Sequence, residues 1–136
     1  MKAMTAKILI VEDEMLVAME LELILHDSGF DPVGIAPDLS SAEEYSELPI
    51  DLALVDLNLR DGLTGPEIGR RLSARGVTVL FITANPRILG SGIAGTIGVV
   101  TKPTDEATVR AAVDFALSRR AGAAQVAPPK ALKLFG

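Results

Sequence analysis

The chain has 136 residues and a formal net charge of −5 at pH 7, from 13 Lys and Arg against 18 Asp and Glu. This length suits one domain of ordinary size, and a composition of 49% apolar and 23% charged residues excludes wholesale disorder, collagen-like repeats and coiled coil. The acidic balance argues against direct nucleic-acid binding, and the absence of Cys excludes disulfides and thiolate metal sites. No apolar run approaches the roughly 18 residues of a membrane-spanning helix or forms a signal-peptide core, so we expect a cytoplasmic protein without membrane insertion.

Short β-branched apolar runs alternate along the chain with segments of helical pattern. This alternation predicts an α/β fold in which helices cover both faces of a parallel sheet. The five predicted strands are residues 7–11, 32–36, 51–56, 77–83 and 97–101.

Helices are predicted at residues 14–28, 40–47, 66–75 and 105–119. We expect Ser40 or Ser41 to cap the second of these, Thr64 or Gly65 the third and Thr104 the last. Between Thr83 and Lys102, residues 84–98 contain four glycines, which predicts a short or mobile helix there.

Helical periodicity predicts which side chains pack and which do not. In the last helix the apolar stripe starts at Val109, and Phe115 falls on the opposite side, so we expect Phe115 to be a lone exposed aromatic or part of a contact surface. Met15 and Met19 are expected to pack from the first helix. Residues 121–136 form a tail that is too short to fold alone, although its Leu134 and Phe135 are candidate contact residues.

Polar side chains follow four of the predicted strands. Glu12 and Asp13 come directly after the first strand, Asp56 ends the third, Thr83 ends the fourth and Lys102 follows the fifth. The carboxyl ends of parallel strands form the ligand-binding edge of such sheets, so these groups are expected to converge. Oxygen ligands without His or Cys favour Mg²⁺, and the Lys and Thr side chains suit a phosphoryl group beside the metal. A carboxylate can attack phosphorus, and Asp56 is the best placed nucleophile.

The motifs that carry these residues resemble the receiver domain of two-component response regulators over about residues 5–120. They are ILIVEDE at 8–14, LVDLN at 54–58 with Gly65 nine residues after Asp56, FITA at 81–84 and TKP at 101–103. The resemblance implies a doubly wound, flavodoxin-like (βα)5 fold with strand order 2-1-3-4-5. It also implies a receiver domain at residues 1–120 and a C-terminal tail at 121–136 without an output domain.

By this similarity the acidic residues hold Mg²⁺ and accept a phosphoryl group. Asp13 binds the metal directly and Glu12 through water, while Asp56 is both the phosphoacceptor and a second metal ligand. The backbone carbonyl of Asn58 is a third metal ligand.

The remaining site residues are assigned by the same resemblance. Thr83 is the switch hydroxyl, Ala84 is the small neighbour that leaves room for the phosphoryl group, and Lys102 is its ion partner, next to a cis peptide bond with Pro103. The sequence departs from the family at Val99, where an aromatic residue usually turns inward when the Thr moves. Valine cannot make that ring rotation, which puts the usual relay in doubt.

The expected function is that of a stand-alone receiver, which is not an enzyme beyond its own phosphorylation and dephosphorylation. The expected partners are a sensor histidine kinase or a histidine phosphotransfer protein, with a possible downstream protein target. It would act as a shuttle, a phosphate sink or a regulator, as a monomer or weak homodimer. The alternative is a constitutive interaction module of the same fold, in which phosphorylation is uncoupled from binding.

Overall fold

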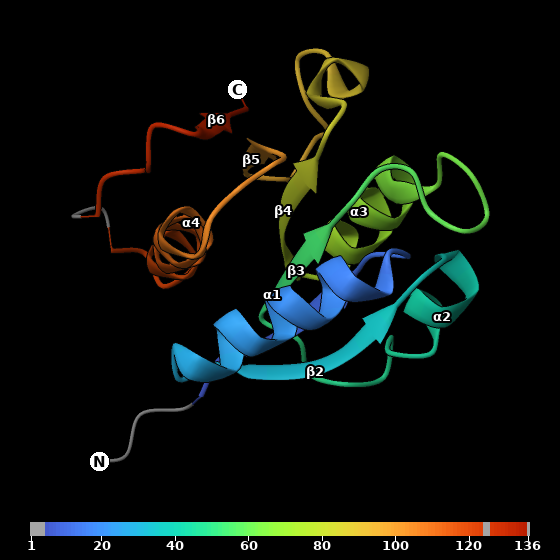
Figure 1. The fold of residues 1–136 in the computed structure, drawn as a ribbon, viewed down its shortest axis with the longest axis horizontal. Coiled ribbons are helices and arrows are strands. Elements are labelled where there is room, and N and C mark those ends of the chain that lie inside the picture. The colour runs from blue at the N-terminus through green and yellow to red at the C-terminus, as the bar shows by residue number, and fades with distance from the viewer. Residues whose placement is uncertain (1–4, 124–125, 136) are drawn as a thin grey trace.

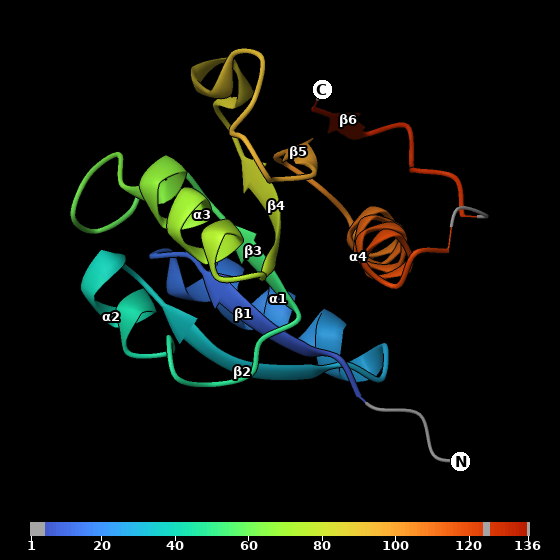
Figure 2. The same cartoon turned by 180° about the vertical axis from the view of Figure 1, so that it is seen from behind.

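The computed structural model describes residues 5–123 and 126–135. Its centre is a six-stranded sheet in the order β2-β1-β3-β4-β5-β6 (Figures 1 and 2). The first five strands are parallel, as predicted, and all but the second are mostly buried, as expected for strands covered on both faces. They are β1 (Lys7–Val11), β2 (Asp31–Ala36), β3 (Leu52–Val55), β4 (Thr78–Thr83) and β5 (Gly98–Thr101).

The sixth strand, β6 (Leu132–Leu134), corrects the prediction of a five-stranded sheet. It pairs antiparallel with β5, with Val99 opposite Lys133. The end of the segment predicted as a tail therefore returns to the sheet and pairs with the edge of β5, as Figure 1 shows. Residues 1–4 of the predicted domain and 124, 125 and 136 of the predicted tail lie outside the described residues.

Two apolar clusters lie on opposite faces of the sheet. One is formed with α1 (Met15–Asp27) and α4 (Glu106–Arg120), and the other with α2 (Leu39–Glu43) and α3 (Gly65–Ala74). Figures 1 and 2 show the two pairs of helices from the two sides. Between β4 and β5, the glycine-rich segment forms only the 3-10 helix η1 (Pro86–Leu89), which confirms the predicted short helix.

The helix caps differ in part from the prediction. Asp38 caps α2, because its carboxylate accepts a hydrogen bond of 2.8 Å from the Ser41 N–H, so neither Ser40 nor Ser41 is the cap. Asp105 caps α4 in the same way, at 2.8 Å from the Thr108 N–H, in place of Thr104. In both helices a nearby carboxylate takes the capping position, two residues before Ser40 in α2 and one residue after Thr104 in α4, and the helix dipole favours its negative charge there.

Two predictions of exposure were wrong, in opposite directions. Phe115 is only 8% exposed and belongs to the apolar cluster on the α1–α4 face. It lines a small hollow with Gly122, Ala123 and Val126, so residues that follow α4 help to enclose it. Met15 and Met19, which were expected to pack, are instead about half exposed, because α1 buries its Ala18 face.

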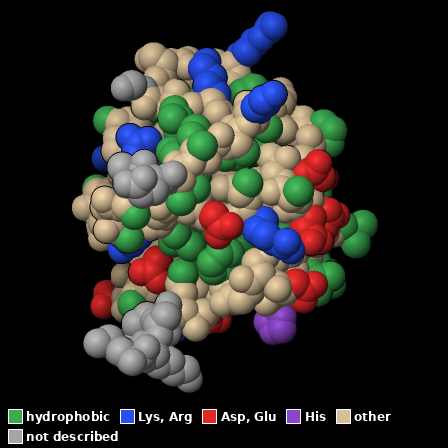
Figure 3. All heavy atoms as spheres, turned by 90° about the vertical axis from the view of Figure 1, so that its left-hand side faces the viewer, with side chains coloured by type: hydrophobic (Ala, Val, Ile, Leu, Met, Phe, Trp, Pro, Cys, Tyr) green, Lys and Arg blue, Asp and Glu red, His purple; other side chains and the backbone are tan. Residues whose placement is uncertain are grey.

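None of the helices in the described residues combines the length and the apolarity that a bilayer crossing needs. On the face shown in Figure 3, Lys and Arg side chains are dispersed among acidic and apolar ones.

Candidate functional site

The candidate site lies where β1, β3, β4 and β5 end, and these four strands are neighbours in the sheet. Three side chains at this edge are buried although they are polar or charged: Glu12 (2% exposed), Asp56 (8%) and Thr83 (1%). Among the described residues, these three form the whole set of buried polar and charged residues outside the glycines. Burial of a charged group is costly unless it is paired, so this concentration marks the edge as a functional site.

Lys102 joins the two buried carboxylates. Its Nζ donates to Glu12 Oε1 at 2.6 Å and to Asp56 Oδ2 at 2.8 Å. Burial raises the pKa of Glu12, and the nearby negative charge of Asp56 adds to this, although the hydrogen bond from Lys102 acts in the opposite direction. Burial lowers the pKa of Lys102, but its bonds to Asp56 and Glu12 outweigh that effect and raise it. One cation therefore serves two buried anions.

Asp56 is fixed by its backbone surroundings. Its N–H donates to the Val11 carbonyl at 2.9 Å, and its Oδ1 accepts from the Leu57 N–H at 2.7 Å. Gly65, at the start of α3, lies so close that a Cβ there would overlap the backbone of Asp56 and Leu57. This close approach explains the glycine nine residues after the acid, since a larger residue would displace the strand end.

Thr83 connects the ends of β4 and β5. Its carbonyl accepts from the Lys102 N–H at 2.8 Å, and its Oγ1 accepts from the Asn85 N–H at 3.1 Å. The hydroxyl thus holds the first residues of the loop after β4. Ala84, the next residue, is exposed and lies beside Lys102 at the wall of a cavity. The Lys102–Pro103 peptide bond is cis.

Two of the predicted metal ligands lie outside the buried group of polar side chains. Asp13 and Asn58 are exposed, and the described residues contain no group of three or more His, Cys, Asp or Glu side chains that is placed to hold a metal ion. Glu12 is turned toward Lys102 and accepts the Glu14 N–H at 3.2 Å through its second oxygen. The donor chemistry still fits Mg²⁺, because Asp13, Asp56 and the Asn58 carbonyl offer only oxygen atoms at neighbouring strand ends.

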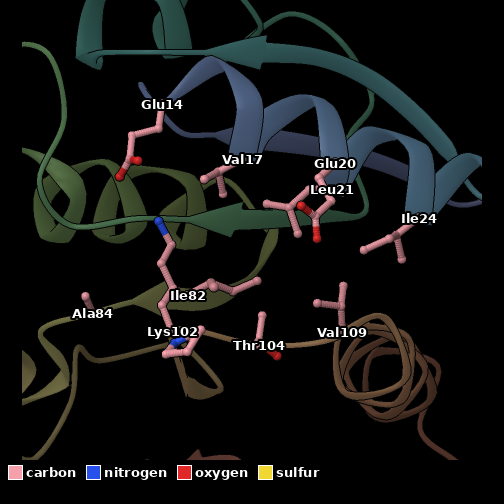
Figure 4. Close-up of a pocket in the computed structure, with 11 residues that line it drawn as sticks. Glu14, Val17, Glu20, Leu21, Ile24, Ile82, Ala84, Lys102, Thr104 and Val109 are labelled. Atoms are coloured by element: carbon pink, nitrogen blue, oxygen red, sulfur yellow. The ribbon is translucent and has the colours of Figure 1, made fainter.

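Beside Lys102 lies a cavity of about 360 Å³ that sequence reasoning missed. Figure 4 shows residues of α1, including Val17 and Leu21, facing Thr104 and Val109 across it. Thr104 Oγ1 is buried there without a hydrogen-bond partner among the residues that the structure describes. The signal in the sequence was the apolar character of α1, which contributes Val17, Leu21 and Ile24 to the lining of the cavity.

Comparison with known proteins identifies the family of the chain. Residues 8–114 match the response regulator receiver domain family. The chain belongs to this family. The receiver domain is 35% identical over 119 residues to the phyllosphere-induced regulator PhyR of Methylorubrum extorquens, which covers 84% of this chain and 44% of that protein. It is 31% identical over 121 residues to the transcriptional regulatory protein PdtaR of Mycobacterium tuberculosis, which covers 86% of this chain and 59% of that protein.

Solved structures show the same fold. The receiver domain of PhyR from Erythrobacter litoralis, determined by NMR, superimposes with a TM-score of 0.73 at 32% identity and covers 92% of this chain and 95% of that one. PhyR from Brucella abortus gives 0.75 at 30% identity, covering 89% of this chain and 51% of that one. The chain thus spans about half the length of the regulators it matches, and its family places it in two-component signalling.

Proposed function

We propose that this receiver domain accepts a phosphoryl group on Asp56 from a phosphohistidine of a sensor histidine kinase or histidine phosphotransfer protein. The observation that carries the proposal is the buried Asp56 carboxylate, held at the end of β3 and paired with Lys102 Nζ at 2.8 Å. The family match supports it, because all the motif residues quoted above lie within or next to the matched region.

In the proposed transfer, an Asp56 oxygen attacks the phosphorus and forms an acyl phosphate. The P–N bond to the donor histidine breaks, and its electron pair stays on the imidazole nitrogen, which takes up a proton. The new group carries about −1.5 to −2 of charge, and Lys102 is close enough to turn toward it. The Thr83 hydroxyl can donate to a phosphoryl oxygen after rotating, and the small, exposed Ala84 leaves space for the group.

Mg²⁺ is the proposed cofactor, held by Asp13, Asp56 and the Asn58 carbonyl. When bound, it supplies positive charge beside the phosphoryl oxygens. Lys102 bonds Glu12 and Asp56 separately, so the buried Glu12 charge would stay paired with Lys102 if Asp56 gave its oxygen to a metal ion. In this proposal the domain acts as a signalling phosphoacceptor, and the only chemistry it catalyses is its own phosphorylation and dephosphorylation.

The test is phosphorylation by a small-molecule donor such as acetyl phosphate, with and without Mg²⁺, followed by intact mass. The wild-type chain should gain one phosphoryl group in Mg²⁺ and lose it on treatment with hydroxylamine, which cleaves acyl phosphates. Asp56→Asn should gain none, whereas Asp114→Asn, which removes an exposed acid on α4, should behave as wild type. Phosphorylation of Asp56→Asn, or none of the wild type, would overturn the proposal.

Val99 favours a second candidate, a constitutive interaction module. It stands where family members usually carry an aromatic residue, and it is buried in the apolar cluster on the α2–α3 side of the sheet. Valine has no ring that could rotate there. Under this alternative, three forms of the domain would bind a protein partner with the same affinity: Asp56→Asn, the unphosphorylated wild type and the phosphorylated wild type. A change in affinity on phosphorylation would exclude it.

A further inference from the structure

The C-terminal residues 132–135 form a segment, here named the strap, that crosses the edge of β5. Leu132 pairs opposite Val100 and Leu134 opposite Gly98, and the Phe135 N–H donates to the Ile97 carbonyl at 2.9 Å. Gly98 has no room for a Cβ, because that atom would overlap the Lys133 carbonyl. The edge of β5 is therefore shaped to the strap, and the strap satisfies backbone groups that an open edge would expose.

Phe135 anchors the strap on the sheet. Its ring lies 6.4 Å from the ring of Phe81 in a tilted arrangement, and it packs against the apolar cluster that includes Leu89 and Val99. On its other side is Gly92, where a Cβ would overlap the Phe135 side chain. Phe135 thus occupies a slot between β4 and the loop that follows it, on the face that the short η1 leaves partly uncovered.

The same loop begins at the candidate site. Asn85 is held by Thr83 Oγ1, η1 follows directly, and the Gly92 N–H donates to the Leu89 carbonyl at 2.8 Å. A continuous series of contacts therefore joins the Thr83 hydroxyl to the slot of Phe135. If the hydroxyl rotates toward a phosphoryl group on Asp56, the bond that holds Asn85 is lost.

We propose that the strap is the moving element of the switch: phosphorylation of Asp56 loosens Phe135 from its slot and uncovers the β5 edge. This inference rests on the proposed function. The loop packs so closely against Phe135 that Gly92 has no room for a Cβ atom, so a small shift of the loop disrupts the packing of the Phe135 ring. Val99 cannot act by ring rotation, whereas Phe135 contacts the same cluster from outside and can leave it.

The test uses the full chain in Mg²⁺, with beryllofluoride as a mimic of the phosphoryl group. Fluorine NMR reports whether beryllofluoride binds, and hydrogen exchange reports protection of residues 97–100 and 132–135. On binding, exchange in these two segments should accelerate by about tenfold or more, while that of the central β1 remains slow. Phe135→Ala should show the fast exchange already without beryllofluoride, and the matched control Lys133→Ala, an exposed β6 residue, should respond as wild type.

The two proposals fail in distinguishable ways. A bound fluorine resonance with unchanged exchange would overturn the strap and leave the proposed function in place. Slow exchange in Phe135→Ala would overturn the role of Phe135 as the anchor. Asp56→Asn should give no fluorine resonance of bound beryllofluoride. If the wild type also gives none, both the proposed function and the strap proposal are overturned.

Discussion

The strongest energetic consequence of the site is that Lys102 neutralises two buried carboxylates at once. Lys102→Met keeps all but the last atom of the side-chain length and removes the cation 2.6 Å from Glu12 and 2.8 Å from Asp56. Glu12, 2% exposed, then has no neighbouring positive charge in the described site, and the two acids face each other across the space that the ammonium group occupied.

The cost follows from the burial of the three groups. Removal of one partner of a buried ion pair costs about 3–5 kcal/mol of folding free energy. The side chains of Lys102 and Asp56 are 16% and 10% exposed, so partial hydration reduces the expected loss to about 2–4 kcal/mol.

The loss should depend on pH. Burial already raises the pKa of Glu12 above its ordinary 4.5, and removal of Lys102, whose hydrogen bond lowers it, raises it further. The folded state of the variant then binds a proton more tightly than the unfolded state does. The destabilisation of the variant is therefore greatest above the pKa that Glu12 has in the folded state, and it decreases as the pH falls toward 4.5.

Urea unfolding followed by circular dichroism, in EDTA at pH 7 and pH 5, measures both effects. Glu12→Gln combined with Lys102→Met removes one of the acids and should recover much of the loss. Lys7→Met, which breaks an exposed pair with Asp31, should cost less than about 1 kcal/mol at either pH. A Lys102→Met chain as stable as wild type at pH 7, or equally destabilised at both pH values, would refute this account of the site.

Two further predictions concern positions next to the site and at the start of α2. Gly65→Ala places a methyl group on the backbone of Asp56 and should cost about 1–3 kcal/mol by overpacking, which thermal unfolding measures; an unchanged midpoint would contradict the close approach. The hydrogen bond from the Ser41 N–H, and to a smaller extent that from Arg60, lowers the pKa of Asp38 from its ordinary 3.8 to about 2. The ionised carboxylate therefore stabilises the fold fully above pH 3.8, and this contribution is lost as the pH falls toward 2. Asp38→Asn keeps a capping acceptor but does not titrate, so its stability should decline less than that of wild type between pH 4 and pH 2; parallel declines in acid unfolding would contradict the role of Asp38.

Much of the fold could be predicted because four of its strands, β1, β3, β4 and β5, are mostly buried apolar runs. The run at Lys7–Val11 is bounded by charged residues, and the predicted strand has the same ends as β1. The caps were harder, since Asp38, Ser40 and Ser41 all favour a helix start and only the backbone geometry selects among them. α1 was ambiguous for a related reason: apolar residues occupy every side of it, so periodicity could not decide that Met15 faces outward.

The candidate site needed more than local pattern. Each strand end could be located from the sequence, but the adjacency of Glu12, Asp56 and Lys102 depends on the strand order, which came from the resemblance to a family. The pairing of Lys102 with both acids was not foreseen, because the sequence suggested a metal ion among the carboxylates. Only the side-chain geometry shows that the chain itself supplies a cation there.

The C-terminal strand shows where sequence reasoning ends and what would have extended it. β6 is three residues long and pairs with a strand more than thirty positions earlier, so no local periodicity could reveal it. A global argument was available, however. A segment with three glycines between β4 and β5 cannot cover the apolar face that carries Phe81 and Val99, and a face of that kind needs another cover. Phe135 offers that cover, while Leu132 of the same strap joins the cluster on the opposite face of the sheet, which includes Phe115.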